Sequence, residues 1–86
     1  MANYQIQIKA SASKELANLE ADLGRRVLQA IDTLATNPRP SQCIKLKGRK
    51  DSYRLRVGKI RVIYQIDDSL KSIMVYEVGY RRDVYR

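Results

Sequence analysis

The chain has 86 residues, of which 44% are hydrophobic and 30% are charged, and its formal net charge is +8. This length and composition predict one domain over residues 1–86 and exclude an intrinsically disordered chain, which would be less apolar. No apolar run approaches the roughly 20 residues of a membrane span, and no signal-peptide pattern opens the chain. We therefore expect a cytoplasmic protein with no membrane partner.

The first forty residues are expected to form one strand and two helices. Residues 4–8 alternate apolar and polar side chains, which is the period of a half-buried strand. A short helix is expected over residues 11–20, capped by Ser11 or Ser13. A second, amphipathic helix follows and ends before the proline-containing segment 37–40. Its apolar stripe consists of Leu23, Val27, Ile31 and Leu34.

From residue 44 onward the apolar side chains recur with a period of two, which is typical of β-strands. Turn residues divide this part of the chain into four strands, at residues 44–47, 52–57, 60–66 and 72–78. Four strands joined by short turns indicate an antiparallel meander. We predict an α+β fold in which the N-terminal strand and a helical hairpin pack on one face of a twisted, mainly antiparallel β-sheet.

The dipeptide Gly58-Lys59 determines which side chains share a face of this sheet. It suits a two-residue type II′ hairpin turn, in which Arg56 lies directly opposite Arg61. Arg54 then joins these two arginines on one face. The apolar residues of the two strands point to the other face, toward the helices. They are Tyr53, Leu55, Val57, Ile60, Val62 and Tyr64.

The three arginines are arranged to bind a polyanion, most simply an RNA backbone. Opposed like charges destabilise an empty sheet by up to about 1 kcal/mol, so this pair favours an anion between its members. Guanidinium groups also bind phosphate in bidentate fashion. Residues 45–86 hold 12 Lys/Arg against 5 Asp/Glu, whereas residues 1–44 hold 5 against 4. The alternatives are a charge that only aids solubility, or ion pairs to Asp51, Asp67, Asp68 or Glu77.

Metal and disulfide chemistry is not expected. Cys43 is the only cysteine, histidine is absent, and the acidic residues occur singly apart from Asp67-Asp68. A disulfide framework and the usual zinc-site spacings are thereby excluded. We expect an inert thiol at Cys43, no metal and no small-molecule cofactor.

Several segments spread over nearly the whole chain form a pattern that is typical of one family. After the N-terminal strand and a helical hairpin ending in Asn-Pro come Lys45-Leu46-Lys47-Gly48, Tyr53-Arg54-Leu55-Arg56-Val57, Arg61-Val62-Ile63-Tyr64 and Val78-Gly79-Tyr80-Arg81-Arg82-Asp83-Val84-Tyr85. This order resembles the RelE/ParE toxin superfamily, and most closely its RelE branch. Members of that branch are ribosome-dependent mRNA endonucleases that a cognate antitoxin holds inactive.

The resemblance implies a toxin of a type II toxin-antitoxin system that cleaves mRNA in the ribosomal A site by attack of a 2′-hydroxyl on the adjacent phosphate. The implied partners are the ribosome, mRNA and an antitoxin. The implied catalytic residues are Arg61, Arg81 and Tyr85. The implied RNA- and phosphate-binding residues are Lys45, Lys47, Arg54, Arg56 and Arg82. The strand pair is Arg where the best-known members have Lys, and the stretch from Arg81 to Tyr85 is shorter, so Arg82 is a candidate to replace or assist Arg81.

The chemistry can be examined separately from the resemblance. RNA cleavage through its own 2′-hydroxyl needs a base, an acid and cations that stabilise charge on phosphorus. Nearby guanidinium groups favour the phenolate of a tyrosine, whose ordinary pKa is near 10, so Tyr85 is the candidate base. An arginine has a pKa above about 12, so the physically secure role of Arg81 is charge stabilisation. Such weak acids and bases fit a need for the ribosome to align the RNA.

Two other functions stay open at this point. One is a ParE-like protein of the same fold that poisons DNA gyrase and has no nuclease chemistry; that branch lacks the basic and tyrosine set. The other is a non-catalytic RNA- or ribosome-binding module, in which the same arginines only bind phosphate.

Overall fold

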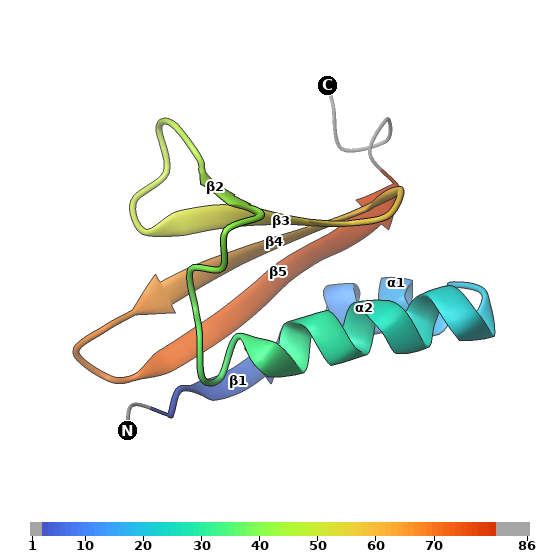
Figure 1. Cartoon of the computed structure of the whole chain (residues 1–86), viewed down its shortest axis with the longest axis horizontal. Helices are drawn as coiled ribbons and strands as arrows, with labels where there is room; N and C mark the ends of the chain where they lie inside the picture. The colour runs from blue at the N-terminus through green and yellow to red at the C-terminus, as the bar shows by residue number, and fades with distance from the viewer. Residues whose placement is uncertain (1–2, 81–86) are drawn as a thin grey trace.

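Five strands form one sheet, and two helices cover one of its faces (Figure 1). The computed structural model describes residues 3–80. In chain order the elements are β1 (Gln5–Ile8), α1 (Ala10–Ala17), α2 (Ala21–Thr33), β2 (Cys43–Lys45), β3 (Ser52–Val57), β4 (Ile60–Asp67) and β5 (Ser72–Tyr80). The predicted α+β class and the predicted order of elements are confirmed. No helix in the described part of the chain is long and apolar enough to cross a membrane.

The strand order in the sheet is β1-β5-β4-β3-β2. Strands β2 to β5 pair antiparallel with their neighbours, so the predicted meander is confirmed. The N-terminal strand β1 is an edge strand of the sheet, where it pairs parallel with β5. A parallel pair needs a long crossover connection, and here the chain between the two strands includes both helices and the other three strands.

The first helix differs at both ends from the predicted range 11–20, because α1 spans Ala10–Ala17. α1 begins at Ala10 with Lys9 as its N-cap, and no side-chain hydrogen bond caps it among the described residues. The predicted caps at Ser11 and Ser13 are therefore wrong. The backbone amide of Lys9 donates to the carbonyl of Val75 on β5, and the amide of Ser13 donates back to the Lys9 carbonyl. The end of β1 thus starts the helix two residues earlier, and both serines lie inside it.

The core lies between α2 and the sheet. The predicted stripe Leu23, Val27, Ile31 and Leu34 is buried, as are the inward residues of β3 and β4. Each fully buried Val, Leu or Ile side chain stabilises the fold by about 1.5–3 kcal/mol relative to an exposed one. Because this burial needs the apolar side chains of β3 and β4 on the helix side, it also holds their polar side chains on the opposite side. That opposite side is called the outer face below.

A β-bulge changes the side-chain alternation of β5. Tyr64 pairs with Val75, but its neighbour Ile63 pairs with Glu77, so Tyr76 is an extra residue on β5. Val75 and Val78 are both buried although they are three residues apart. The bulge therefore places two consecutive side chains, those of Tyr76 and Glu77, on the outer face.

Candidate functional site

The β3–β4 hairpin has the register that the sequence predicts. Arg56 pairs with Arg61, Arg54 with Ile63 and Val57 with Ile60. Gly58 has a φ of +60°, as the first central residue of a type II′ turn requires. A residue other than glycine is strained at this φ. The turn therefore fixes the register, and the register places the arginines.

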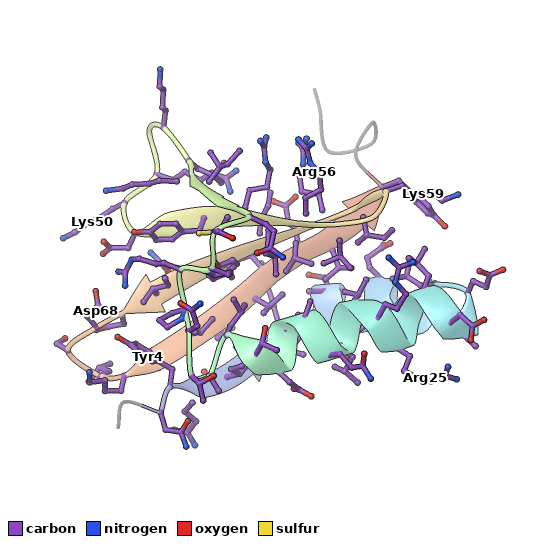
Figure 2. All side chains as sticks on the ribbon, in the orientation of Figure 1. Tyr4, Arg25, Lys50, Arg56, Lys59 and Asp68 are labelled. Carbon is purple, nitrogen blue, oxygen red and sulfur yellow. The ribbon has the colours of Figure 1, made fainter. Side chains whose placement is uncertain are left out.

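The outer face carries all three arginines of the hairpin. Figure 2 shows the Arg56 side chain pointing away from the helix layer. Arg56 is exposed and Arg54 is half-buried. Arg61 lies on the same face but is only 4% exposed. Ile63, two residues further along β4 on this face, is 5% exposed. Side-chain parity predicts the face on which Arg61 lies, but it says nothing of how deeply this face is covered.

The carboxylates that could neutralise these arginines are mostly engaged elsewhere. Asp68 forms an ion pair of 2.8 Å with Arg39, and Glu77 lies 3.9 Å from Arg49. The Ser69 hydroxyl and the Leu70 amide donate to Asp67, and these bonds lower the pKa of that carboxyl group. Within residues 3–80, neither Arg54 nor Arg56 forms an ion pair with a carboxylate. The interpretation that local carboxylates neutralise this pair of arginines is therefore not supported.

The outer-face side chains form rows across the strands. The first row is Arg56, Arg61 and the position of Gly79, which contributes no side chain. The second row is Ile44, Arg54, Ile63 and Glu77. The third row includes Ser52 and Gln65. The first row thus places two guanidinium groups side by side. Arg54 adds a third guanidinium group in the second row, whose β5 end is the Glu77 carboxylate.

The remaining predicted site residues are not all brought to this face. Lys45 pairs with Tyr53, whose side chain points toward the helices, so Lys45 is exposed on the helix side of the edge strand β2. Lys47 lies in the loop between β2 and β3, which also carries Arg49 and Lys50. Arg81, Arg82 and Tyr85 lie outside the described residues. The structure therefore brings together Arg54, Arg56 and Arg61 and separates Lys45 from them.

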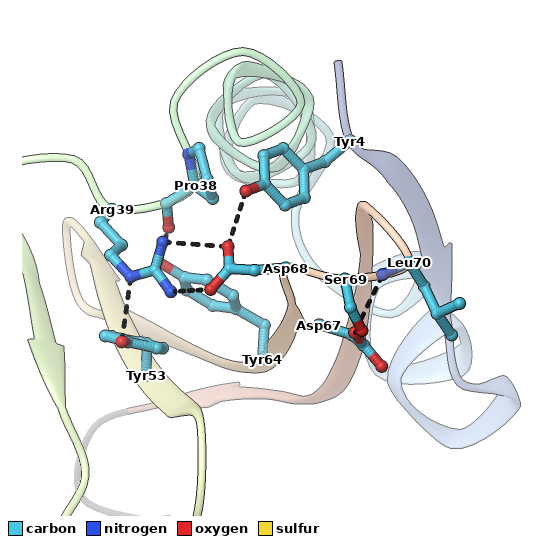
Figure 3. Close-up of polar contacts among 9 residues, drawn as sticks. All are labelled: Tyr4, Pro38, Arg39, Tyr53, Tyr64, Asp67, Asp68, Ser69 and Leu70. Carbon is cyan, nitrogen blue, oxygen red and sulfur yellow. Dashed lines mark hydrogen bonds and ion pairs between the residues drawn. The ribbon is translucent and has the colours of Figure 1, made fainter. Parts of the chain in front are cut away.

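A second polar cluster joins three loops at the other end of the sheet (Figure 3). The Arg39 guanidinium donates to both carboxylate oxygens of Asp68, at 2.8 and 3.4 Å, and to the Tyr53 hydroxyl at 3.0 Å. The Tyr4 hydroxyl donates to Asp68 at 2.6 Å. The hydrogen bonds from Arg39 and Tyr4 lower the pKa of Asp68. The hydrogen bond to Asp68 raises the pKa of Tyr4.

Tyr53 and Tyr64 of this cluster are buried in the core, on the face predicted for them. The rings of Tyr53 and Tyr64 stack with centroids 5.9 Å apart, and the Tyr64 hydroxyl donates to the Pro38 carbonyl at 2.8 Å. Burial raises the pKa of Tyr64 far above its ordinary range. Sequence reasoning missed the roles of Arg39 and Tyr4, because no local pattern shows that residues 29 and 64 positions before Asp68 meet at its carboxylate.

The described residues offer no metal centre. Within residues 3–80, no group of three or more His, Cys, Asp or Glu side chains could hold a metal ion. The outer face can bind phosphate through its guanidinium groups.

Comparisons with known proteins place this chain in a family. A family model described as the ParE toxin of the type II toxin-antitoxin system, parDE, matches residues 6–85. A RelE-like toxin protein of Escherichia coli is 34% identical over 95% of this chain and 90% of its own length. Toxin RelE1 of Methanocaldococcus jannaschii is 29% identical over 96% of each chain.

Solved structures agree with these matches. The archaeal RelE-RelB complex from Pyrococcus horikoshii OT3 has a chain with a TM-score of 0.82 and 34% identity, over 94% of this chain and 97% of that one. The isolated E. coli RelE toxin gives a TM-score of 0.79 at 26% identity, over 95% and 90%. The fold and the family model define a toxin of type II toxin-antitoxin systems. The chain belongs to the RelE/ParE family of these toxins, which confirms the resemblance found in its sequence.

Proposed function

We propose that this protein is a ribosome-dependent endoribonuclease that cleaves mRNA in the ribosomal A site and so inhibits translation in the cytoplasm. The observation that carries the proposal is the direct opposition of Arg56 and Arg61 on the outer face, with Arg54 beside them. A sheet that holds two guanidinium groups in register is less stable when empty. The arrangement is useful if the phosphate of a bound RNA lies between them.

In the proposed reaction the 2′-hydroxyl of one nucleotide attacks the phosphorus of the next linkage. The new O2′–P bond forms as the P–O5′ bond breaks, which leaves a 2′,3′-cyclic phosphate and a 5′-hydroxyl. Arg54, Arg56 and Arg61 position the phosphate and stabilise its developing charge. By the family resemblance, Tyr85 accepts the proton of the 2′-hydroxyl, and Arg81, with Arg82 as helper, stabilises the charge at the leaving 5′-oxygen, which takes its proton from solvent water.

Dependence on the ribosome follows from the weakness of these groups as acids and bases. The chain has no histidine, whose ordinary pKa would suit both roles at neutral pH. Orientation of reacting groups can supply about 7–11 kcal/mol of a barrier. A ribosome that holds the mRNA backbone in line would contribute in this way, while the protein contributes the cations.

A cognate antitoxin is the second proposed partner. The P. horikoshii relative, at 34% identity, was solved as a complex of RelE with RelB. The outer face of the present chain has exposed Arg56 and half-buried Arg54, with more cations on the β2–β3 loop. An antitoxin segment with acidic side chains would neutralise this charge and block access of RNA.

Primer extension on mRNA from translating ribosomes tests the nuclease. Wild-type protein is expected to produce new 5′ ends, on the downstream fragments, within codons in the A site. Tyr85→Phe and Arg81→Ala are each expected to slow cutting by about 100-fold or more, the usual size of a lost acid–base group for the tyrosine and of a lost charge-stabilising group for the arginine. Arg25→Ala is the control, because Arg25 lies on the helix side (Figure 2). Intact mRNA with wild-type protein would refute the nuclease, and full cutting by both variants would refute the assignment of Tyr85 and Arg81.

Gyrase inhibition is the competing function, because the matching family model is described as ParE toxin. A DNA supercoiling assay with purified gyrase, run with the same preparation of protein, separates the two activities. Loss of supercoiling together with intact mRNA would favour the gyrase function. Supercoiling at the control rate, with cut mRNA, supports the nuclease.

A further inference from the structure

A hollow of about 470 Å³ lies on the outer face beside the arginine rows. Its floor consists of side chains from three strands, Ser52 of β3, Gln65 of β4 and Tyr76 of β5. Lys9, at the connection from β1 to α1, stands on one side. Arg49 and Lys50, from the β2–β3 loop, stand on the other. The proposed cleavage chemistry uses none of these residues.

The floor of the hollow is held in place by hydrogen bonds. The Tyr76 hydroxyl donates to Oε1 of Gln65 at 2.7 Å, and Nε2 of Gln65 donates to the Lys50 carbonyl at 3.2 Å. The Ser52 hydroxyl donates to the same carbonyl at 3.3 Å. A primary amide can form two hydrogen bonds at each end, so Gln65 keeps the capacity for one more donor and one more acceptor contact. The tyrosine ring and the amide are therefore presented in fixed positions.

The rim of the hollow is mostly cationic. The Lys9 ammonium lies 5.8 Å from the centroid of the Tyr76 ring. Arg49 lies 3.9 Å from Glu77, which is longer than a hydrogen bond, and both side chains are about half exposed. Lys9 and Arg49 thus place two cations beside one carboxylate and a single aromatic ring, and Lys50 also lines the hollow.

The hollow is continuous with the arginine rows. Ser52 and Arg54 are two residues apart on β3 and point to the same face, which places them about 6.6 Å apart along the strand. The β5 bulge brings the Tyr76 side chain to this face beside Glu77, the last member of the Arg54 row. A flexible polyanion held by Arg54 and Arg56 would therefore pass over the hollow as it runs along the strands.

An aromatic ring, an amide and several cations are the groups that bind single-stranded RNA, where bases stack on aromatic side chains and phosphates contact Lys and Arg. We infer that this hollow is a nucleotide subsite, which binds the nucleotide next to the phosphate held by Arg54, Arg56 and Arg61. The base packs on Tyr76, the edge of the base contacts the Gln65 amide, and the flanking phosphate contacts Lys9, Arg49 and Lys50. This inference rests on the proposed function in one respect, that the outer face binds RNA.

Fluorescence anisotropy with a labelled single-stranded RNA hexanucleotide tests the subsite. Tyr76→Leu is expected to weaken binding about tenfold, within the range that stacking of a base on an aromatic ring supplies. Tyr76→Phe keeps the ring and is expected to stay within about threefold of wild type. Tyr80→Leu is the matched control: the same substitution on the same strand, at a residue that pairs with Ile60 and points to the helix side.

An abasic oligonucleotide with the same number of phosphates separates stacking from charge. On this ligand the loss caused by Tyr76→Leu is expected to disappear, because no base is present to pack on the ring. An equal loss on the abasic and normal strands would overturn the subsite, since the ring would then act through the fold or the backbone. Thermal melts of each variant exclude unfolding as the cause.

The outcomes distinguish failure of the subsite from failure of the proposed function. If wild type and Tyr76→Leu bind the hexanucleotide equally while Arg56→Ala binds it weakly, the subsite is refuted and the phosphate site stands. If wild type binds RNA and loses affinity with Tyr76→Leu but leaves mRNA intact on ribosomes, the subsite stands and the nuclease is refuted. If no free RNA binds, the subsite is refuted and an antitoxin side chain becomes the candidate occupant of the hollow, whereas the nuclease is judged by the ribosome assay alone.

Discussion

Arg56 of β3 and Arg61 of β4 lie directly opposite each other across the hairpin, in the register fixed by the turn at Gly58. Their backbones are held together by the sheet, so the two side chains start from neighbouring positions on the outer face. Bringing two like charges together in this way destabilises the empty fold and prepares it for an anion. Stability and binding are therefore expected to change in opposite directions when one of the pair is replaced.

Arg56→Gln tests this opposition. The variant is expected to raise the melting temperature by about 2–5 °C, because relief of like-charge repulsion contributes some tenths to about 1 kcal/mol in a domain of this size. Its affinity for a single-stranded RNA is expected to fall, with the slope of log affinity against log salt reduced by about 0.7 per lost phosphate contact. Thermal melts and anisotropy titrations at several salt concentrations measure both effects.

Arg25→Gln is the control for that experiment. Arg25 is a surface residue of α2 paired with Asp22 at 3.0 Å, on the helix side of the molecule (Figure 2). The same substitution there is expected to leave RNA affinity unchanged and to lower stability by no more than about 0.5 kcal/mol. A melting temperature that falls in Arg56→Gln would contradict the repulsion between the paired arginines.

Glu77→Gln is expected to strengthen RNA binding. Glu77 occupies the β5 end of the row that contains Arg54, and it lies diagonal to Arg61 across β4 and β5. Diagonal neighbours are about 7–8 Å apart, so a phosphate bound at Arg61 would lie at about this distance from Glu77. The repulsion between two unit charges at this distance in a water-like medium is about 0.6 kcal/mol, and its removal corresponds to a factor of about three in affinity. Anisotropy at low salt measures the gain.

The control removes a carboxylate from the other layer. Asp32 lies on α2, on the far side of the sheet. Asp32→Asn is expected to leave the RNA affinity unchanged at physiological salt. Weaker binding by Glu77→Gln would show instead that Glu77 organises the hollow through its contact with Arg49.

The Arg39–Asp68 ion pair predicts a change of stability with acid. Because Arg39 and Tyr4 depress the pKa of Asp68 in the folded protein, its contribution is present above the unfolded value of 3.8 and is lost as the pH falls through the lower folded value. Asp68→Asn is therefore expected to melt below wild type at neutral pH and to match it in stronger acid. Melts followed by circular dichroism across this range check the convergence.

Asp22→Asn is the matched substitution for the acid experiment. Asp22 forms an exposed ion pair with Arg25 one helical turn away, so its loss is expected to have little effect at any pH. A constant difference between wild type and Asp68→Asn across the acid range would refute the ion pair as its cause.

Gly58→Ala tests the turn that sets the register. Gly58 has a φ of +60°, which residues with a side chain rarely adopt. The new Cβ would lie 3.7 Å from Nη2 of Arg26, which is an ordinary van der Waals contact. The expected loss of about 1–2 kcal/mol thus comes from backbone strain alone. Gly58→Asn is expected to lose less, because asparagine tolerates positive φ better. Equal losses in urea denaturation would count against this explanation.

The sequence alone determined the part of the fold that depends on local rules. The period of the side chains and a glycine at the first turn position were enough to predict the helices, the meander and the pairing of Arg56 with Arg61. The family resemblance followed from the same segments. These features are local because each depends on residues that are close together in the chain.

Only the tertiary structure decided what surrounds the arginines. The β5 bulge brought Tyr76 to the outer face, the register of an edge strand sent Lys45 to the helix side, and Arg39 met Asp68 across 29 residues. Each of these results depends on how separate segments pack against one another. Alternation along one strand predicts the face of a side chain, but packing against other strands and loops determines where that alternation breaks and how deeply a charge such as Arg61 is buried.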